Sequence, residues 1–184
     1  MNRCPWCGNN DLYIKYHDEE WGVPVHDDKK HFEFLVLESA QAGLSWLTVL
    51  KKRENYRKAY DNFDVNKVSQ YDENKVKKLM QNAGIIRNLK KIEASINNAE
   101  RFIEIQKEFG SFDKYIWSFV NNTPILNNWN DISEVPAKSE LSDKVSKDLK
   151  KRGFKFLGST IMYAHLQATG LINDHLSSCF RFNS

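Results

Sequence analysis

Four potential metal ligands at the two ends of this chain constrain its fold more than any other feature. Cys4 and His17 lie near the start of the 184-residue sequence, and His175 and Cys179 lie near its end. His175 and Cys179 are four residues apart, so on a helix both would project from one face. Two thiolates and two imidazoles complete a tetrahedral Zn²⁺ shell with no position left for water. The sequence therefore predicts a structural zinc ion that joins the N-terminal and C-terminal segments.

Other uses of the cysteines remain open at this point. Cys7 follows Cys4 in a C-x-x-C pattern that is also typical of metal chelation and of redox pairs, and a chance grouping of ligand types is a further alternative. The chain has three cysteines, an odd number, and its start has no apolar core of signal-peptide type. These features indicate a reducing cytoplasm. No run of about 18 apolar residues occurs, so we expect no membrane association.

The periodicity of apolar residues is helical almost throughout. It predicts long helices over residues 28–42, 45–60 and 85–109, and the first and third are followed by Gly43 and Gly110 as end signals. Residues 121–138 hold two prolines and five asparagines and are predicted to form a loop. No segment alternates convincingly as a strand. We therefore expect a single all-α domain over residues 1–184.

Aromatic residues gather in a segment that has no helical or strand period. Trp6, Tyr13, Tyr16 and Trp21 all lie there. Aromatic side chains outside a periodic face often line a pocket for a flat ligand, although a small satellite core under a loop is the alternative. Glu38 lies in an otherwise apolar helix face, where an ionised carboxylate needs a partner, unless it sits at the surface of the last turn.

Residues 147–175 indicate contact with a nucleic-acid backbone. Lys150–Arg152 end one helix, a turn contains Gly153 and Gly158, and a new helix begins at Ser159. Free N–H groups at a helix start, with the helix dipole and nearby lysines, favour phosphate. The alternative is an ordinary joint between two helices with a solvated basic end. The net charge of +3 is compatible with a nucleic-acid partner without requiring one.

The whole chain resembles the bacterial 3-methyladenine DNA glycosylase I family of the helix-hairpin-helix superfamily. The matching stretches are RCPW at 3–6, YIKYHDEEWGVP at 13–24, LESAQAGLSWLTVLKKRENYR at 37–57, NAGIIRNLKKI at 82–92, WSFVN at 117–121 and KKRGFKFLGSTIMYAHLQATGLINDH at 150–175. The resemblance implies an all-α, helix-hairpin-helix glycosylase-like bundle. Its hairpin would span about residues 142–170, and residues 1–26 and 171–184 would form the zinc-joined termini.

The resemblance also assigns roles to individual residues. The zinc ligands would be Cys4, His17, His175 and Cys179, with Cys7 outside the set. A methylated base flipped out of the duplex would be held by residues of the pocket. Trp46 matches the stacking residue, Glu38 and Tyr16 match the polar pair that reads the base edge, with Glu38 as the catalytic group, and Trp6, Tyr13 and Trp21 match the aromatic wall.

The implied reaction is hydrolysis of the N-glycosidic bond of 3-methyladenine in alkylated double-stranded DNA, with free 3-methyladenine as product. Many superfamily members carry an Asp where this chain has Asn173, and bifunctional members carry a Lys near Ser159-Thr160, so we expect no strand-cleaving lyase activity. A monomer without a dissociable cofactor is expected in the bacterial cytoplasm. DNA contacts are expected from Lys155, Gly158, Ser159, Thr160 and Leu44, with Leu44 either a wedge or a buried loop anchor.

Two other functions are alternatives. The first is a non-catalytic helix-hairpin-helix DNA-binding module that carries a structural zinc ion. The second is a cytosolic zinc enzyme that acts on free nucleosides, which a closed four-ligand shell disfavours because it offers no open position. Glu38 together with Trp46 favours the glycosylase over the silent module, because a module that binds backbone alone needs no base pocket.

Overall fold

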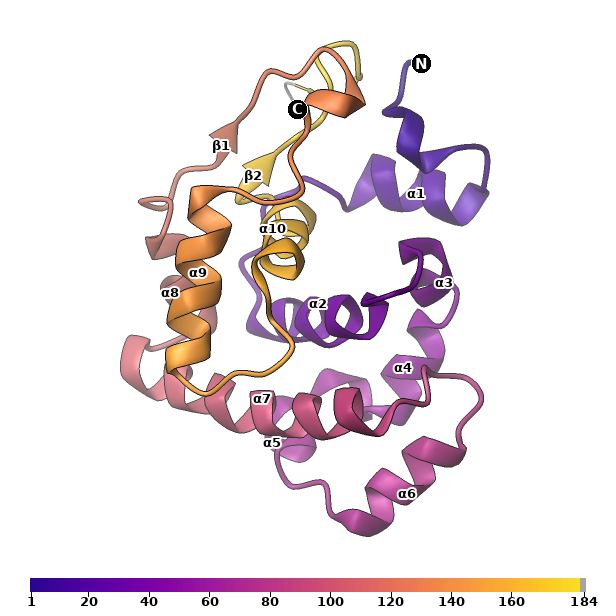
Figure 1. Cartoon of the computed structure of the whole chain (residues 1–184), viewed down its shortest axis with the longest axis vertical. Helices are drawn as coiled ribbons and strands as arrows, with labels where there is room; N and C mark the ends of the chain where they lie inside the picture. The colour runs from indigo at the N-terminus through magenta and orange to yellow at the C-terminus, as the bar shows by residue number, and fades with distance from the viewer. Residues whose placement is uncertain (183–184) are drawn as a thin grey trace.

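The helix α2 (Asp28–Gln41) runs through the middle of the molecule (Figure 1). A computed structural model describes the chain over residues 1–182. The side chain of Asp27 accepts a hydrogen bond from the N–H of Lys30 and so caps the start of α2. All residues from His31 to Ala40 are buried, because α3, α7, α8 and α10 pack around the helix. The helix predicted over 28–42 is confirmed.

After α2 the chain forms several short helices, then one long helix, α7, and then the short helix α8. These are α3 (Trp46–Leu50), α4 (Arg53–Ala59), the short 3₁₀ helix η2 (Asp61–Phe63), α5 (Val65–Val68), α6 (Glu73–Gln81), α7 (Leu89–Phe109) and α8 (Phe112–Ser118). Gly110 adopts a left-handed conformation and ends α7, as its position after the apolar run predicts. The long helix starts at Leu89 rather than at residue 85, because the side chain of Asn88 caps the N–H of Lys91.

The single helix predicted over 45–60 is wrong, since the chain forms two helices with a turn between them. The N–H of Lys52 bonds to the carbonyl of Val49, three residues back, which tightens the backbone there. The guanidinium of Arg53 is buried in ion pairs with Glu20 and Glu33. These long-range ion pairs fix the direction of α4 and are absent from any local sequence pattern.

The aromatic N-terminal segment is also helical. It contains the 3₁₀ helix η1 (Pro5–Cys7) and α1 (Asp11–Glu19), whose start is capped by the side chain of Asn10. Periodicity did not predict α1, because its apolar side chains do not face one continuous core. Some pack against the main core and others line a cavity described below.

The C-terminal half brings distant segments together. The predicted 121–138 loop contains a two-residue strand, β1 (Ile125–Leu126), and the 3₁₀ helix η3 (Ile132–Glu134). It leads into α9 (Glu140–Lys151), a turn, and α10 (Ser159–Ala168), followed by β2 (Ile172–Asn173). β1 pairs with β2 in parallel, with Ile125 opposite Ile172. The fold is therefore helical with a minimal sheet, and the all-α expectation is confirmed.

The two ends of the described chain lie at the same end of the molecule (Figure 1). The N–H of Phe180 bonds to the carbonyl of Asn2, and the side-chain amide of Asn2 bonds to the carbonyl of Ser178. Within residues 1–182, no helix combines the length and the apolar character needed to cross a bilayer.

Candidate active site and metal centre

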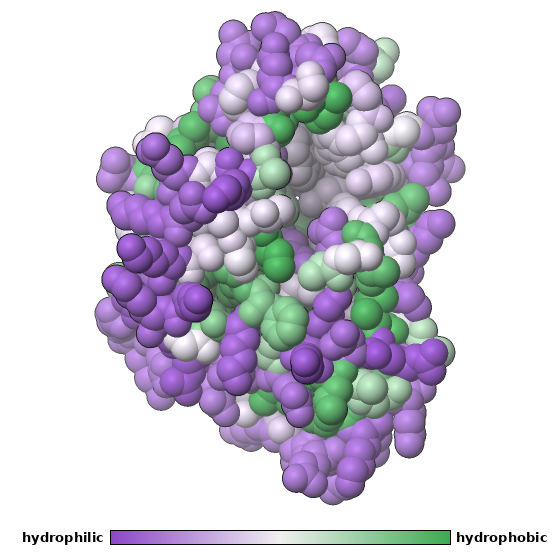
Figure 2. Space-filling model, in the orientation of Figure 1, coloured by the Kyte–Doolittle hydropathy of each residue, from purple (hydrophilic) through white to green (hydrophobic). Residues whose placement is uncertain are grey.

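A cavity of about 380 Å³ opens between α1, α10 and the loop that carries η3 (Figure 2). Its floor comes from α2 and α3, so segments that are far apart in the sequence enclose it. We call it the aromatic cavity. Of the residues predicted to bind a base, all six line it: Trp6, Tyr13, Tyr16, Trp21, Glu38 and Trp46. The fold thus brings together positions spread over the first 46 residues of the sequence.

Glu38 is buried at the base of the aromatic cavity, with a side chain that is 3 % exposed. Its Oε2 lies 2.9 Å from Nδ1 of His165 on α10. Its Oε1 is buried and has no hydrogen-bond partner within the described part of the chain. Burial raises the pKa of this carboxyl well above its usual range, while the nearby His31 opposes that rise. The surface-carboxylate alternative for Glu38 is therefore wrong.

Trp46 and Tyr16 stand next to Glu38. Their ring centroids are 5.5 Å apart, with planes inclined by 51°. The ring of Trp46 is also nearly parallel to that of Phe34, with a centroid distance of 6.4 Å and an interplanar angle of 22°. Its indole Nε1 is a buried donor without a partner among residues 1–182. Each unpaired buried polar atom of this kind costs free energy, so a ligand with matching groups would gain by filling the cavity.

Trp6, Tyr13 and Trp21 form a packed aromatic wall. The ring centroid of Trp6 is 5.0 Å from that of Tyr13 and 5.0 Å from that of Trp21. All three rings are partly buried against the core. They are carried by η1, α1 and the turn after α1, so the missed helix α1 is what positions this side of the aromatic cavity.

Asp174, a residue without a role predicted from the sequence, also lines the aromatic cavity. Its carboxylate is almost fully buried and accepts hydrogen bonds from four side chains. The donors are Asn127, Trp129, Tyr163 and Gln167. Asn173 occupies the position at which many superfamily members are expected to carry an Asp. Its side chain accepts a hydrogen bond from the N–H of His175 and donates one to the carbonyl of Phe182. No local pattern marks Asp174, because its donors come from two other elements, α10 and a loop that lies 45 or more residues away.

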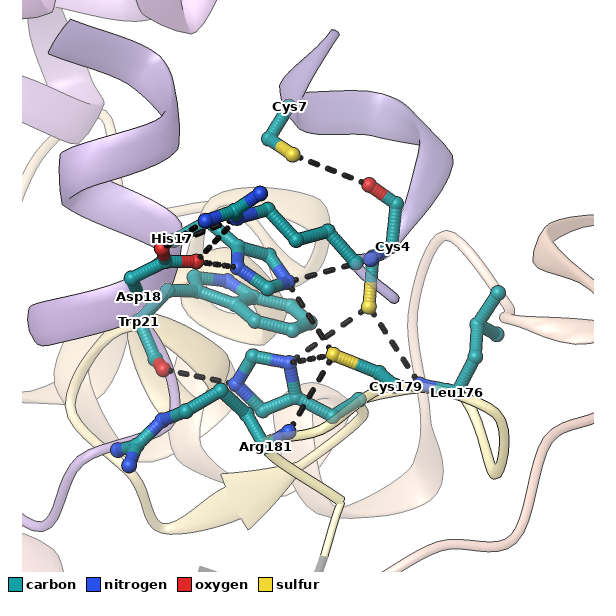
Figure 3. Close-up of polar contacts among 10 residues, drawn as sticks. Cys4, Cys7, His17, Asp18, Trp21, Leu176, Cys179 and Arg181 are labelled. Atoms are coloured by element: carbon teal, nitrogen blue, oxygen red, sulfur yellow. Dashed lines mark hydrogen bonds and ion pairs between the residues drawn. The ribbon is translucent and has the colours of Figure 1, made fainter. Parts of the chain in front are cut away.

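The four predicted metal ligands converge at the joined termini, and three of them, Cys4, His17 and Cys179, are labelled in Figure 3. Their ligand atoms lie within 4.8 Å of one another, and all four residues are buried. Sγ of Cys179 lies 3.5 Å from Nε2 of His17 and 3.5 Å from Nδ1 of His175, and Sγ of Cys4 lies 3.6 Å from that Nδ1. Tetrahedral zinc, with bonds of about 2.3 Å to sulfur and about 2.0 Å to nitrogen, requires S–N separations near about 3.6 Å. The donor set and its spacing therefore fit Zn²⁺.

In both His17 and His175, the ring nitrogen that points away from the other ligand atoms, here called the outer nitrogen, has a hydrogen-bond partner. Nδ1 of His17 lies 2.8 Å from a carboxylate oxygen of Asp18, and Nε2 of His175 lies 3.0 Å from the carbonyl of Trp21. Both partners accept, so the ring hydrogens belong on these outer nitrogens and the inner nitrogens present lone pairs to the cluster. The inner Nε2 of His17 also accepts a 3.3 Å hydrogen bond from the N–H of Cys4. Desolvation lowers the pKa of His175 to about 4, which keeps its ring neutral. The Cys7 thiol instead donates to the carbonyl of Cys4 and lies outside the cluster (Figure 3).

The predicted DNA-contact residues lie at the α9–α10 turn and at the α2–α3 turn. Gly158 is the N-cap residue of α10, and Thr160 lines the aromatic cavity. Lys155, Gly158 and Thr160 are exposed, while Ser159 is half-buried because its hydroxyl lies 2.9 Å from that of Ser142. Leu44 is 42 % exposed, so the buried-anchor alternative for this residue is wrong.

The fold and the cavity define a helical protein that can enclose a flat, polar ligand between aromatic rings and one buried carboxyl group. The family model described as methyladenine glycosylase matches residues 6–182. The chain belongs to this family.

Several characterised relatives agree along nearly the whole length. The chain is 51 % identical to DNA-3-methyladenine glycosylase 1 of Escherichia coli K12 over 97 % of its length and 96 % of the relative's. It is 49 % identical to DNA-3-methyladenine glycosylase of Haemophilus influenzae, with 96 % of each chain covered. The crystal structure of a Y16F variant of a 3-methyladenine DNA glycosylase I in complex with 3-methyladenine superposes with a TM-score of 0.96 at 38 % identity, covering 100 % and 99 % of the two chains.

Proposed function

We propose that this chain is a DNA glycosylase that releases 3-methyladenine from alkylated duplex DNA by hydrolysis. The observation that carries the proposal is the aromatic cavity, which is lined by Trp46 and by a buried Glu38 whose Oε1 has no hydrogen-bond partner among residues 1–182. Family membership and the relatives named for 3-methyladenine support the same reaction. The rival function is a silent DNA-binding module. Such a module has no use for a cavity in which Oε1 of Glu38 and Nε1 of Trp46 lack partners among the described residues.

The base is proposed to enter the aromatic cavity after it is rotated out of the duplex. Inside the stack the bond from C1′ to the base is out of reach, so extrusion must precede reaction. The indole of Trp46 offers a stacking surface, and Glu38 and Tyr16 offer polar atoms to the base edge. Trp6, Tyr13 and Trp21 would exclude water from the other side.

Hydrolysis needs little chemical assistance from the protein. Methylation at N3 places positive charge on the base, so the C1′–N bond breaks with its electron pair moving onto a base that leaves neutral. Water supplies the oxygen that bonds to C1′ and releases a proton to solvent. The contribution of the chain is therefore binding, orientation and a negative electrostatic environment for the cationic sugar, with Asp174 as the acidic group that lines the cavity.

The α9–α10 hairpin is proposed to be a helix-hairpin-helix element that binds one phosphate. Backbone N–H groups of Gly158, Ser159 and Thr160 would donate to the phosphate, with Lys155 nearby. Leu44 is exposed and can act as the wedge that fills the gap left by the flipped base. Ser159 and Thr160 provide no amine for a Schiff base, so we propose a monofunctional enzyme without lyase activity.

The cysteine–histidine cluster is proposed to hold a structural zinc ion. Cys4 and His17 would bind it from the N-terminal segment, and His175 and Cys179 from the C-terminal segment. A bound zinc ion fixes both termini next to α1 and so stabilises the aromatic wall. A single domain over residues 1–184, a monomeric state and a bacterial cytoplasmic location stay predictions.

The decisive experiment is incubation of the zinc-loaded protein with N-methylated duplex DNA, followed by chromatography of released bases. We expect free 3-methyladenine and an intact abasic strand. Binding of the duplex without any released base would favour the silent DNA-binding module. Strand cleavage that is trapped by borohydride would contradict the monofunctional mechanism.

A further inference from the structure

A row of buried polar groups leads away from the aromatic cavity through α10 and α2. It begins at Oε2 of Glu38, 2.9 Å from Nδ1 of His165. Nε2 of His165 lies 3.3 Å from Nδ1 of His31, and Nε2 of His31 lies 3.1 Å from the carbonyl oxygen of Val25. The side chains of both histidines are 0 % exposed. We call these three side chains and the Val25 carbonyl the histidine relay.

The outer end of the histidine relay determines which atoms carry hydrogen. The carbonyl of Val25 can only accept, and a carboxylate oxygen of Asp113, another acceptor, lies 3.7 Å from the same His31 nitrogen. Nε2 of His31 must therefore carry a hydrogen. In a neutral ring its Nδ1 is then a bare acceptor, so Nε2 of His165 must donate to it. Nδ1 of His165 is bare in turn, and the remaining hydrogen must come from Oε2 of Glu38.

The electrostatics of the site agree with a relay that carries no net charge. Desolvation lowers the pKa of His165 to about 3 and also lowers the pKa of His31, so both rings are neutral near neutral pH. The same burial raises the pKa of Glu38 well above its usual range. With a carboxylic acid and two neutral imidazoles, every hydrogen bond of the histidine relay is donated in the same direction, from Glu38 towards the carbonyl of Val25.

We propose that His165, held by His31, is a positioning residue that keeps the Glu38 proton on Oε2, so that Oε1 faces the aromatic cavity as a permanent acceptor. An acceptor at this place selects a base edge that presents an N–H group. 3-Methyladenine offers its exocyclic amino group, whereas the matching 6-oxo base, 3-methylhypoxanthine, offers a second acceptor. Two acceptors in contact lose the hydrogen bond and repel each other. The choice of these bases rests on the proposed function, but the proton arrangement does not.

The proton arrangement is tested directly by ¹⁵N NMR of the histidine rings in the zinc-loaded wild-type protein at neutral pH. We expect His165 and His31 both in the neutral tautomer with hydrogen on Nε2. A hydrogen on Nδ1 of His165, in either the neutral or the cationic ring, would overturn the proposal. This readout does not depend on any ligand, so it separates failure of the relay from failure of the proposed function.

The selectivity is tested with a matched pair of variants, His165→Leu and His165→Asn. Both remove the imidazole and its link to His31, but the side-chain carbonyl of asparagine can still accept the Glu38 proton. Dissociation constants for free 3-methyladenine and free 3-methylhypoxanthine are measured by quenching of tryptophan fluorescence. We expect His165→Leu to reduce the preference for the amino base by about tenfold and His165→Asn to retain most of it.

Two results would overturn the selectivity argument. An unchanged preference in His165→Leu would mean that the Glu38 proton needs no partner. An equal loss of the preference for the amino base in both variants would mean that it depends on packing of the imidazole and not on its role as an acceptor. If the wild-type protein binds neither base, the ligand assignment itself fails, and the NMR result still decides where the proton lies.

Discussion

The indole Nε1 of Trp129 donates a 2.7 Å hydrogen bond to Oδ1 of Asp174, and this bond joins two segments that are 45 residues apart. Trp129 belongs to the proline- and asparagine-rich loop, whereas Asp174 directly precedes the proposed zinc ligand His175. The loop also contributes Ile132 and Val135 to the aromatic cavity. Asp174 therefore acts as an anchor that holds one wall of the cavity against α10.

Asp174→Asn should destabilise the protein by about 3 kcal/mol, because the amide group of asparagine would face donors that now bond to a carboxylate oxygen. Urea unfolding measures the change. Asn127→Ala removes one of the four donors and leaves the other three, so we expect a loss of about 1 kcal/mol. Equal effects of the two substitutions would contradict the anchoring role of Asp174.

The stability of wild type relative to Glu38→Gln should depend on pH. Burial raises the pKa of Glu38 in the folded protein above its usual value of 4.5, so the folded chain retains a proton that the unfolded chain releases. Its stabilising contribution is complete below about pH 4.5 and falls by up to about 1.4 kcal/mol per pH unit as the pH rises towards the raised value.

Glutamine has no such proton, so Glu38→Gln should gain stability relative to wild type as the pH rises through this window. Urea titrations of both proteins at several pH values, each with excess zinc, measure the difference. A difference that stays constant with pH would show that Glu38 is ionised in the folded state.

Cys179→Ala should abolish stoichiometric zinc binding and lower the unfolding free energy by at least about 3 kcal/mol, because ligand loss uncouples the two termini. Metal analysis after gel filtration, combined with thermal unfolding, measures both effects. Cys7→Ala is the control, since its thiol bonds to the carbonyl of Cys4 and lies outside the cluster. Retention of zinc by Cys179→Ala together with its loss from Cys7→Ala would reassign the ligand set.

Trp46→Ala should weaken binding of free 3-methyladenine by about 1–3 kcal/mol, which is the range for stacking of a base on an aromatic ring. Trp46→Phe keeps a ring and should recover most of this loss. Isothermal titration of each variant gives the affinities, and circular dichroism checks the fold. Equal affinity of Trp46→Ala and wild type would remove stacking from the mechanism.

Gly170→Ala should be strongly destabilising, by about 3 kcal/mol or more. Gly170 has a φ of +73°, and a Cβ atom there would lie 2.4 Å from the backbone nitrogen of Pro24. Gly43→Ala provides the comparison, because its φ is +82° but a Cβ atom there meets open space. Gly43→Ala should lose only the cost of the left-handed conformation, about 1 kcal/mol. Similar melting temperatures for the two variants would contradict the steric argument.

Local sequence signals were sufficient to predict much of the helical framework. Asp27 and Ser111 cap the helices that follow them, and Gly110 ends α7, as their positions suggest. These features depend on residues within one or two turns of each other, so a single sequence contains them. The candidates for the cavity and the metal centre came from residue types and from the family resemblance, and the structure brings each group together.

Long-range contacts determined the remaining features. Glu38 and His165 are 127 residues apart, so no local pattern could reveal that one oxygen of Glu38 has a partner and that the other has none in the described part of the chain. The turn between α3 and α4 depends on Arg53 bonding to Glu20 and Glu33, and the role of Asp174 depends on donors from two other segments. By itself the sequence determined which groups are present and where several of the helices begin or end. Only the tertiary structure decided which polar atoms find partners within the protein and which remain for a ligand, because burial and pairing depend on segments that meet after folding.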